Sequence, residues 1–439
     1  MFIQNFTNIS KGGFSNKGHF LFLLGVLLLP TALPIAAIFL LTSLFISFSE
    51  IKFSFLKDKL NFAILLSIFL IILSSLFNTN FVSSNEFKNV NSYIWLNLFN
   101  WIPALLGFIG FQKYLKTNKD RFIFSKYLIA GTIPVIASCL FQLFFNINGP
   151  FETLNGLIVW FQKPIENTGG VSGLFSNRNY AGFWLAVNLP FSFFLLKNNM
   201  NHAIKRIFLF IITSLIIFLI ISTNSRNALL SMLSTIIIYF GMKGILLVAI
   251  FSFLLFFIYV LAPTINLNII EFLPTTFLRL GGSNFFINSP RVVLYRSVIN
   301  YILQKPFLGW GSGTFAIIYL ARENFWNPPF IFFKPQHSHN LLFEMAFNFG
   351  IPLAILITSI TFTIMKDCLS IIFSYKYLNE YYKLDKAWVA SGIVVLLMHL
   401  TDIPFFDGKV SLYISILFSG LRCISLKKNN LELQCKEYI

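Results

Sequence analysis

Residues 61–80 read NFAILLSIFLIILSSLFNTN, a stretch without a single charged side chain. An α-helix needs about 20 consecutive, mostly apolar residues to cross the hydrocarbon core of a membrane. Similar stretches recur along the chain. The further spans expected from them are 93–111, 123–145, 179–196, 207–222, 227–241, 245–262, 340–365, 388–404 and 409–425. This pattern predicts an all-α, polytopic transmembrane protein.

The composition agrees with this prediction. Hydrophobic residues make up 56% of the 439 residues and charged residues 11%, and the mean hydropathy is +0.75. Soluble domains carry about 25% charged residues, so most of this surface must be solvated by lipid. The four cysteines (Cys139, Cys368, Cys423 and Cys435) lack CxxC or metal-ligand spacing and imply no disulfide framework.

The net charge of +17 does not indicate a nucleic-acid partner, because no basic soluble domain is present to hold one. Lys and Arg instead accumulate in cytoplasmic loops of membrane proteins. Lysines flank the first apolar block, 20–48, on both sides, and Pro30 and Pro34 interrupt it. With both flanks in the cytoplasm, the block forms a helical hairpin or two short tilted spans. The chain then crosses about twelve times, with both termini cytoplasmic and no cleaved leader.

This topology divides the chain into four parts. They are an N-terminal transmembrane bundle of about nine spans (1–262), an extracytoplasmic loop (263–339), C-terminal transmembrane helices (340–425) and a cytoplasmic tail (426–439). Within the loop, Ser289 as cap and Pro290 as first helical residue predict an amphipathic helix that ends at Lys305-Pro306 and lies along the membrane surface. The glycines of Gly309–Gly313 lack the following Lys-Ser/Thr of a phosphate cradle, so a tight turn is expected there.

The two basic residue types distribute differently on this topology. Five of 24 lysines fall outside, but six of nine arginines do. Arg presents a planar fork suited to carboxylate and phosphate, so an anionic ligand is expected outside. Ordinary loop arginines paired with acids or lipid headgroups are the alternative. The outside arginines are Arg178, Arg226, Arg279, Arg291, Arg296 and Arg322.

Three helices expected to run inward begin with polar segments, 173–180, 222–227 and 337–340. Arg226 follows the plausible N-cap Ser225, and Arg291 begins the loop helix. An arginine at a helix N-terminus is repelled by the positive end of the helix macrodipole, which costs about 0.3–1 kcal/mol. If an anion binds there, the guanidinium and the helix dipole both attract it. Converging helix starts therefore predict a phosphate or pyrophosphate site; snorkelling to lipid phosphates is the alternative.

His337 and His339 stand at the third of these starts. No further ligand follows at a recognised spacing, so a metal is not expected. The more specific hypothesis is that one of these histidines acts as a general base or donates a hydrogen bond to a sugar or phosphate. Glu344 should face the bundle interior and orient a histidine or cap a neighbouring helix. His399 and Asp402 are candidates to line the same cavity.

Together these motifs resemble the O-antigen ligase and polysaccharide polymerase family of bacterial membrane glycosyltransferases. The resemblance covers roughly 170–355 in register. Its elements are the segment Gly173–Asn179, then Arg226, then Arg291 followed by Pro306, Gly309 and Gly311, and finally His337, His339 and Asn340 with Glu344 and Gly350.

The resemblance implies an inverting, metal-independent and cofactor-free transfer of a glycan from an undecaprenyl-pyrophosphate carrier to an acceptor hydroxyl. It implies a multi-pass protein of the bacterial inner membrane with a periplasmic active face. Arg226 and Arg291 would hold the pyrophosphate and stabilise it as it leaves. His339 would activate or position the acceptor hydroxyl, with His337 as the second candidate. The residues expected to bind substrate are Arg178, Asn179, Arg296, His337, Asn340 and Glu344.

Three acceptors remain open within this family. An O-antigen ligase with a lipid A–core acceptor is favoured, and a polysaccharide polymerase or a protein O-oligosaccharyltransferase are the alternatives. Membrane lipids are expected neighbours in each case. A small-anion transporter of bicarbonate type is a different class, but transporters tend to carry internal repeats, which the sequence lacks.

Overall fold

The structure is a computed structural model of the 439-residue chain. It describes residues 14–50, 57–81, 90–165, 169–199, 201–261, 290–322, 335–374 and 381–428. Much of the predicted loop (262–289 and 323–334, with Arg279), most of the predicted tail (429–439, with Cys435) and the predicted cap Ser289 lie outside the described residues.

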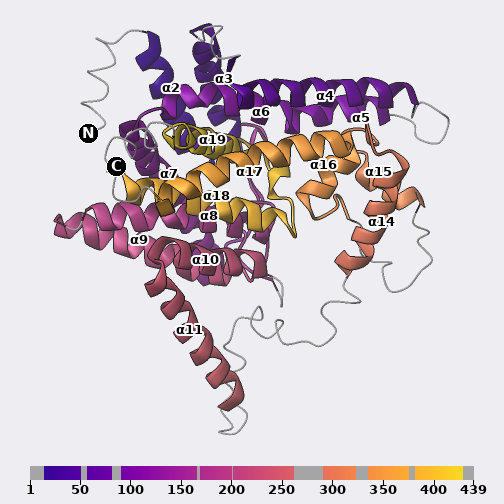
Figure 1. Cartoon of the computed structure of the whole chain (residues 1–439). Helices are drawn as coiled ribbons and strands as arrows, with labels where there is room; N and C mark the ends of the chain where they lie inside the picture. Colours follow the sequence, from indigo (N-terminus) through magenta and orange to yellow (C-terminus); the bar gives the residue numbers. More distant parts are fainter. Residues whose placement is uncertain are drawn as a thin grey trace.

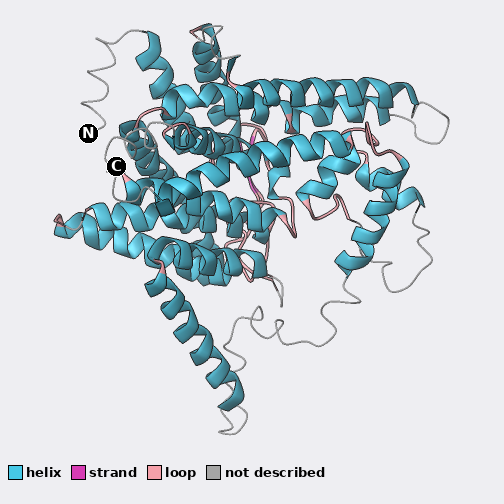
Figure 2. Ribbon diagram, viewed as in Figure 1, coloured by secondary structure: helices cyan, strands magenta, loops and turns pink. Residues whose placement is uncertain are grey.

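Helices account for most of the described structure (Figures 1 and 2). The α-helices are α2 (Phe14–Leu28), α3 (Leu33–Ser49), α4 (Lys59–Phe81), α5 (Val90–Asn97), α6 (Ile102–Gly110), α7 (Asn118–Phe145), α8 (Arg178–Asn198), α9 (Ala203–Ser222), α10 (Arg226–Phe240), α11 (Met242–Leu261), α14 (Pro290–Gln304), α15 (Phe315–Arg322), α16 (Leu341–Phe349), α17 (Ile351–Ser374), α18 (Tyr382–His399) and α19 (Gly408–Ser425). Short 3₁₀ segments are η2 (Leu98–Asn100), η3 (Phe111–Leu115) and η4 (Pro404–Phe406). One antiparallel hairpin joins β1 (Phe151–Thr153) to β2 (Ile158–Trp160).

Within these described residues, 6 helical segments are long and apolar enough to cross a membrane. The prediction of a helical membrane protein is thus consistent with the structure, but the prediction of about twelve crossings is not confirmed. The remaining expected spans fall on helices outside these segments, among them α10, α11, α18 and α19. The qualifying segments are Lys59–Thr79, Ser92–Leu115, Asn118–Phe145, Arg178–Asn198, Ala203–Ser222 and Ile351–Ser374.

The first apolar block folds as two helices, α2 and α3, which pack against each other. The turn between them is held by the indole of Trp160, whose Nε1 donates to the carbonyl of Thr31 at 2.7 Å. Both forms expected for block 20–48 contain two helices joined by a turn, and such a pair is observed; the number of crossings stays a prediction. The β1–β2 segment therefore lies at the same end of the bundle as this turn.

Two expected spans are not single helices. The span at 93–111 runs through α5, η2 and α6, and the span at 340–365 breaks at Gly350 between α16 and α17. Gly350 has φ +94, and a Cβ there would lie 2.1 Å from the carbonyl oxygen of Phe307. A side chain would collide with that backbone, so glycine permits the close approach of the connection between α14 and α15, which contains Phe307.

Helix α8 occupies the centre of the bundle and packs against α7, α9, α10 and α18 (Figure 1). Every residue from Ala181 to Leu189 is buried. A helix that is buried all round has its position fixed by its neighbours. The N-terminus of α8 is therefore held rigidly, and the candidate site is built around it. Helix α11, by contrast, projects away from the bundle (Figure 1).

Ion pairs gather at the opposite end of the bundle. Lys113 pairs with Glu50 at 2.5 Å, Lys428 with Asp367 at 2.8 Å, and Arg422 with Asp58. The fully buried Asp385 pairs with Lys427 at 2.8 Å and with Arg121 at 3.8 Å. Arg422 lies in the last turn of the expected span 409–425, and the other residues belong to segments expected in the cytoplasm. Lysine-rich connections and polar helix starts thus lie at different ends, as the charge pattern predicts.

The described part of the loop packs onto the C-terminal helices. Helix α14 begins at Pro290 and ends before Lys305, as predicted, and its buried face contacts α16. The turn at Gly309–Gly313 also docks on α16. The amides of Trp310 and Gly311 donate to the carbonyls of Phe347 and Asn348 at 2.8 and 2.9 Å. Because these amides bond protein carbonyls, the segment acts as a turn and not as a phosphate cradle.

Candidate functional site

Three helix starts at one end of the bundle carry side-chain caps. The side chain of Asn177 accepts from the amide of Asn179 at the start of α8. Ser225 Oγ accepts from the amide of Ala228 at the start of α10, and Asn340 Oδ1 accepts from the amide of Phe343 at the start of α16. Such caps fix where each helix begins. The positive ends of these three helix dipoles face the same end of the bundle.

The starts of α8 and α10 are in direct contact. A Cβ added to Gly182, in the second turn of α8, would lie 2.7 Å from Cβ of Ala228 and 3.2 Å from Oγ1 of Thr223. Only glycine allows the two helices to approach so closely. The side chain of Asn179 in turn donates to Asp402 Oδ2 at 2.6 Å. The start of α8 thus lies between α10 and the connection that follows α18.

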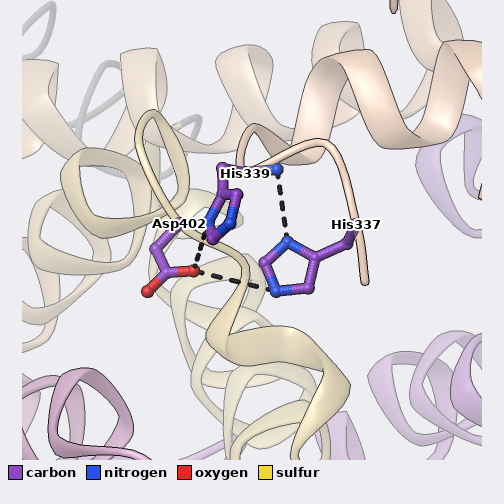
Figure 3. Close-up of side chains that lie close together, drawn as sticks. All are labelled: His337, His339 and Asp402. Atoms are coloured by element: carbon purple, nitrogen blue, oxygen red, sulfur yellow. Dashed lines mark hydrogen bonds and ion pairs between the residues drawn. The ribbon is translucent and has the colours of Figure 1, made fainter. Parts of the chain in front are cut away.

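Asp402 joins this end of α8 to the two histidines (Figure 3). His339 Nδ1 lies 3.1 Å from Asp402 Oδ1, and His337 Nε2 lies 3.9 Å from the same oxygen. The ring centroids of the histidines are 4.4 Å apart. The carboxylate is 2% exposed and the two imidazoles 12% and 18%. The cluster is therefore largely shielded from water, and its interactions are stronger than they would be at a surface.

The charge of Asp402 determines which nitrogen of His339 carries the proton. Burial alone would raise the pKa of Asp402, but the hydrogen bond and charge of His339, with help from His337 and the amide of Ile403, lower the pKa to about 2. The carboxylate is ionised near neutral pH and can only accept. His339 Nδ1 must then donate, so the lone pair of the neutral ring is on Nε2.

His337 is held in the opposite tautomer. Its Nδ1 accepts the backbone N–H of His339 at 3.2 Å, so in the neutral ring the proton sits on Nε2, which faces Asp402. Burial, with the charges of His339 and Arg291, lowers the pKa of His337 to about 4 despite the attraction of Asp402. The ring is therefore neutral at pH 7.

The same three residues are close enough to hold a cation, because their ligand atoms lie within 4.8 Å of one another. Asp402 is the third ligand that sequence spacing did not provide. In the observed hydrogen-bond pattern, however, the His337 nitrogen that faces the cluster bears a proton and is not a metal ligand in that form. The absence of a metal remains a prediction.

The backbone of His339 is in the left-handed region, with φ +56. Histidine adopts this conformation more readily than most residues, but it remains uncommon. Two contacts hold it in place: the His339 amide bonds to His337, and the hydroxyl of Tyr295 donates to the His339 carbonyl at 3.1 Å. Asn340 adds a bond from Nδ2 to the carbonyl of Leu400 at 3.0 Å, which ties the α16 start to the end of α18.

Glu344 supports the segment between the two histidines. Its Oε2 accepts the amide of Ser338 at 2.8 Å and its Oε1 accepts Nδ2 of Asn348 at 3.1 Å. Glu344 is 1% exposed and faces the bundle interior, as expected. It orients the histidines through the backbone of Ser338 rather than by touching a ring.

The predicted arginines take different positions. Arg291, near the start of α14, lies within electrostatic range of His337, because its charge adds to burial in lowering the pKa of that histidine. Arg226 and Arg178 are the half-buried first residues of α10 and α8. Arg296 is exposed and forms no ion pair with any residue that the structure describes. The structure therefore does not bring Arg296 into the cluster.

Sequence reasoning gave too little weight to Asp402 and missed Tyr295. The available signal for Asp402 was a carboxylate directly after a buried apolar helix, where an ionisable group needs a partner. For Tyr295 it was the spacing of four residues from Arg291, which places both on one face of a helix. His399 does not join the cluster; its Nδ1 lies 2.8 Å from the carbonyl of Val395 in its own helix.

A comparison with family models identifies part of the chain. Residues 208–358 match the model described as O-antigen ligase. Over this segment the chain is similar to the O-antigen ligase family. The resemblance inferred from the motifs is thereby confirmed. No protein in the curated collection matches the chain.

The segment matched to O-antigen ligase contains Arg226, Arg291 and both histidines of the cluster. It excludes Asn179 and Asp402, which complete the hydrogen-bonded group from α8 and from the connection after α18. The apolar helices and the family together indicate an integral membrane protein with glycosyltransferase-like chemistry.

Proposed function

We propose that the protein is an inverting glycosyltransferase that moves a glycan from an undecaprenyl-pyrophosphate carrier to an acceptor hydroxyl at the extracytoplasmic face of the bacterial inner membrane. The observation that carries this proposal is the pair formed by His339 and Asp402, 3.1 Å apart, with Arg291 within electrostatic range of the cluster. A base and a cation that share one shielded site suit a reaction that takes a proton at one atom and releases an anion at another.

In the first part of the reaction His339 acts as general base. The acceptor O–H donates to Nε2 of His339, which takes the proton as the acceptor oxygen attacks the anomeric carbon. The ring becomes an imidazolium while Nδ1–H remains bonded to Asp402. The ionised carboxylate stabilises that positive charge and holds the ring in the productive tautomer, as in other base–carboxylate pairs. Asp402 is thus a positioning residue in this proposal.

In the second part the bond between the anomeric carbon and the phosphate oxygen breaks. The electron pair leaves with the pyrophosphate, which departs from the face opposite to the attack, so a single displacement inverts the anomeric centre. Arg226 and Arg291 would stabilise the charge that develops on the leaving oxygen. The positive ends of the α8, α10 and α16 helix dipoles add partial positive charge at the same end.

The family match favours this enzyme over the transporter alternative, and the polar groups lie at one end of the bundle rather than at its middle. Within the family we favour a lipid A–core sugar as acceptor. The polymerase and the protein O-oligosaccharyltransferase share the same chemistry and differ only in the hydroxyl that attacks.

The proposal is tested with purified full-length protein and a synthetic undecaprenyl-pyrophosphate oligosaccharide. Wild-type protein should release undecaprenyl pyrophosphate only when an acceptor is present, and the new linkage should have the opposite anomeric configuration. His339→Ala and Arg291→Ala should abolish release while remaining folded in the membrane. Release that is equally fast in both variants would overturn the proposal. Supplying lipid A–core, repeat-unit glycan or protein as acceptor separates the three family members.

A further inference from the structure

Residues 146–165 form a hairpin segment between α7 and the start of α8, and the tip of this hairpin is apolar. Leu154 and Leu157, the first and last residues of the turn between β1 and β2, are 63% and 58% exposed. The charged residues of the segment are Glu152 and Lys163, fewer than the share of about 25% that soluble domains carry. Exposed apolar patches of this kind mark sites of contact with proteins or membranes. The other large apolar side chains that the segment exposes are Ile147, Phe151, Phe161 and Ile165.

The backbone at the tip shows that turn formation does not account for the leucine at position 154. Leu154 has φ +51 and Asn155 has φ +54, both in the left-handed region. Asn, Asp and Gly adopt this region at little cost, whereas leucine rarely does. Asparagine at position 154 would form the same turn with less strain. Strained residues of this kind concentrate where they have a function, so the exposed apolar side chain itself needs an explanation.

The base of the hairpin is fixed to the bundle. Ile158 is buried, and the indole of Trp160 holds the turn between α2 and α3. The amide of Gln162 donates to the carbonyl of Gly173 at 2.9 Å, and its Nε2 donates to the carbonyl of Ile147 at 2.6 Å. Gly173 belongs to the connection that leads into α8. The hairpin is therefore held in place next to the α8 start, at the end of the bundle that carries the candidate site.

The lipid-facing surface of α7 leads into the hairpin segment. Helix α7 is long and apolar enough to cross a membrane, and Phe141, Phe144 and Phe145 are exposed in its last turns. The amide of Ile147 donates to the carbonyl of Phe141 at 3.3 Å. This bond holds the first exposed apolar residue of the hairpin segment against the end of the expected span. Lipid that covers the end of α7 therefore meets the hairpin segment next.

We propose that the hairpin segment is a membrane anchor that inserts Leu154 and Leu157 among the lipid acyl chains of the leaflet on the side of the candidate site. A two-stranded hairpin has unpaired backbone N–H and C=O groups at its edges, and such groups do not occur in contact with lipid in the hydrocarbon core. The backbone therefore lies at the level of the headgroups, where Glu152 and Lys163 stay hydrated. Because the base is bonded to the connection before α8, the anchor sets the height of the α8 start relative to the membrane surface.

Spin-label accessibility tests the lipid contact in full-length protein in phospholipid nanodiscs. The three described cysteines are buried, so Cys435→Ser leaves a single site for a label, introduced by Leu157→Cys. We expect this label to collide more often with oxygen, which concentrates in the bilayer, than with a water-soluble nickel complex. A label at Phe144→Cys, on the lipid-facing surface of α7, should behave in the same way. Lys119→Cys, exposed at the other end of α7, is the water-exposed control.

Two outcomes of this measurement would overturn the proposal. A label at Leu157 with the accessibility of the label at Lys119 would show that the tip lies in water. A label at Leu157 that neither oxygen nor the nickel complex reaches would show that a second copy of the chain or another protein covers the tip.

Removal of the leucines tests the anchor by mutation. In the double variant Leu154→Asn and Leu157→Asn, position 154 keeps a residue that tolerates the left-handed φ, so the hairpin should still fold. The ratio of oxygen to nickel collisions for a label at Phe161→Cys, exposed on the same segment, should then shift toward the ratio of a water-exposed label. Leu154→Asn alone gives the same test should the double variant fail to fold. Asn148→Ser, at an exposed polar position of the segment, is the matched control. An unchanged ratio in the folded double variant would contradict the proposal.

Both measurements are made without a glycan donor, so the anchor and the proposed reaction are tested independently. Lipid contact at Leu157 in a protein that transfers no glycan would support the anchor and refute the reaction. A water-exposed tip in a protein that transfers glycan normally would refute the anchor alone.

Discussion

Asp402 Oδ1 lies 3.1 Å from His339 Nδ1, although 63 residues separate them in the chain. The pair joins the connection after α18 to the start of α16, and Asn179 extends it to α8 with a bond of 2.6 Å. Three segments that are distant in sequence therefore meet at one carboxylate. The chemistry proposed for His339 depends on this meeting point.

Replacing Asp402 by Asn keeps the size of the side chain but removes its charge. His339 then loses both its fixed tautomer and the anion that stabilises its protonated form. We expect kcat to fall about 10²- to 10⁴-fold, with the KM for the donor changed much less, as measured with purified protein. Asp407→Asn is the matched control, since Asp407 caps α19 and Asn caps equally well. Comparable activity of Asp402→Asn and Asp407→Asn would exclude the positioning role.

His339 has a backbone role and a chemical role, and two substitutions distinguish them. Asn tolerates the left-handed φ of +56, whereas β-branched Val does not. His339→Asn should therefore keep a wild-type melting temperature and lose activity. His339→Val should lose activity and also unfold at a lower temperature, because the strained conformation costs about 1–3 kcal/mol. Thermal unfolding in detergent, followed in parallel with turnover, checks this; an active His339→Asn protein would remove His339 from the mechanism.

The lowered pKa of His337 predicts a stability change with pH. Its pKa is about 4 in the folded protein and about 6.5 when unfolded. Between about pH 6.5 and 4, His337 is protonated in the unfolded chain but stays neutral in the folded protein. The free energy of unfolding therefore falls as the pH decreases through this range, by about 1.4 kcal/mol per pH unit. His337→Gln should flatten the decrease in melting temperature over this range. An equally steep decrease in the variant would show that another group titrates there.

Glu344 and Asn348 allow a sharp comparison between Gln and Ala. Oδ1 of Asn348 is buried without a hydrogen-bond partner among the described residues. In Glu344→Gln, a flip of the Asn348 amide turns this oxygen toward the new NH₂ group, so stability should stay close to wild type. Glu344→Ala leaves the amide of Ser338 and the Asn348 side chain unpaired, at about 1–3 kcal/mol each. Thermal unfolding measures both; an equally large loss for Gln and for Ala would show that the negative charge itself is required.

The hydroxyl of Tyr295 bonds to the carbonyl of His339, so Tyr295→Phe removes one support of the strained residue. A net hydrogen bond of about 0.5–1.5 kcal/mol corresponds to a two- to tenfold reduction in kcat. Tyr93→Phe, at an exposed position on α5, is the control and should leave kcat unchanged. Equal rates for the two variants would show that the remaining contacts suffice to hold His339.

The helical, membrane-protein character followed from the sequence because uncharged stretches such as 61–80 have few other possible structures in water or lipid. The starts of α10 and α14 were also predictable, since Ser225 and Pro290 are strong local signals. The breaks within 93–111 and at Gly350 were not. They result from tertiary packing, in this case from the approach of Phe307 to the backbone of Gly350.

The candidate site was predictable as far as local motifs extend. His337, His339 and Glu344 stand within eight residues, and in the structure Glu344 bonds the backbone between the two histidines. The partner Asp402 is distant in sequence, and no spacing rule connects it to the histidines. Arg296 was expected to bind substrate because it is an arginine on the same helix as Arg291. It lies on the exposed face of α14, which its position in the sequence did not reveal.

The carboxylate that holds His339 lies beyond residue 358, where the recognisable motif-bearing segment ends. Anyone exchanging that segment between two relatives to swap their specificities would separate the base from its anchor. A functional graft must also bring the beginning of α8 and the link between α18 and η4. The proposed chemistry therefore depends on three segments that are separated in the chain. Recombination that exchanges only one of them should impair activity even where each segment folds normally.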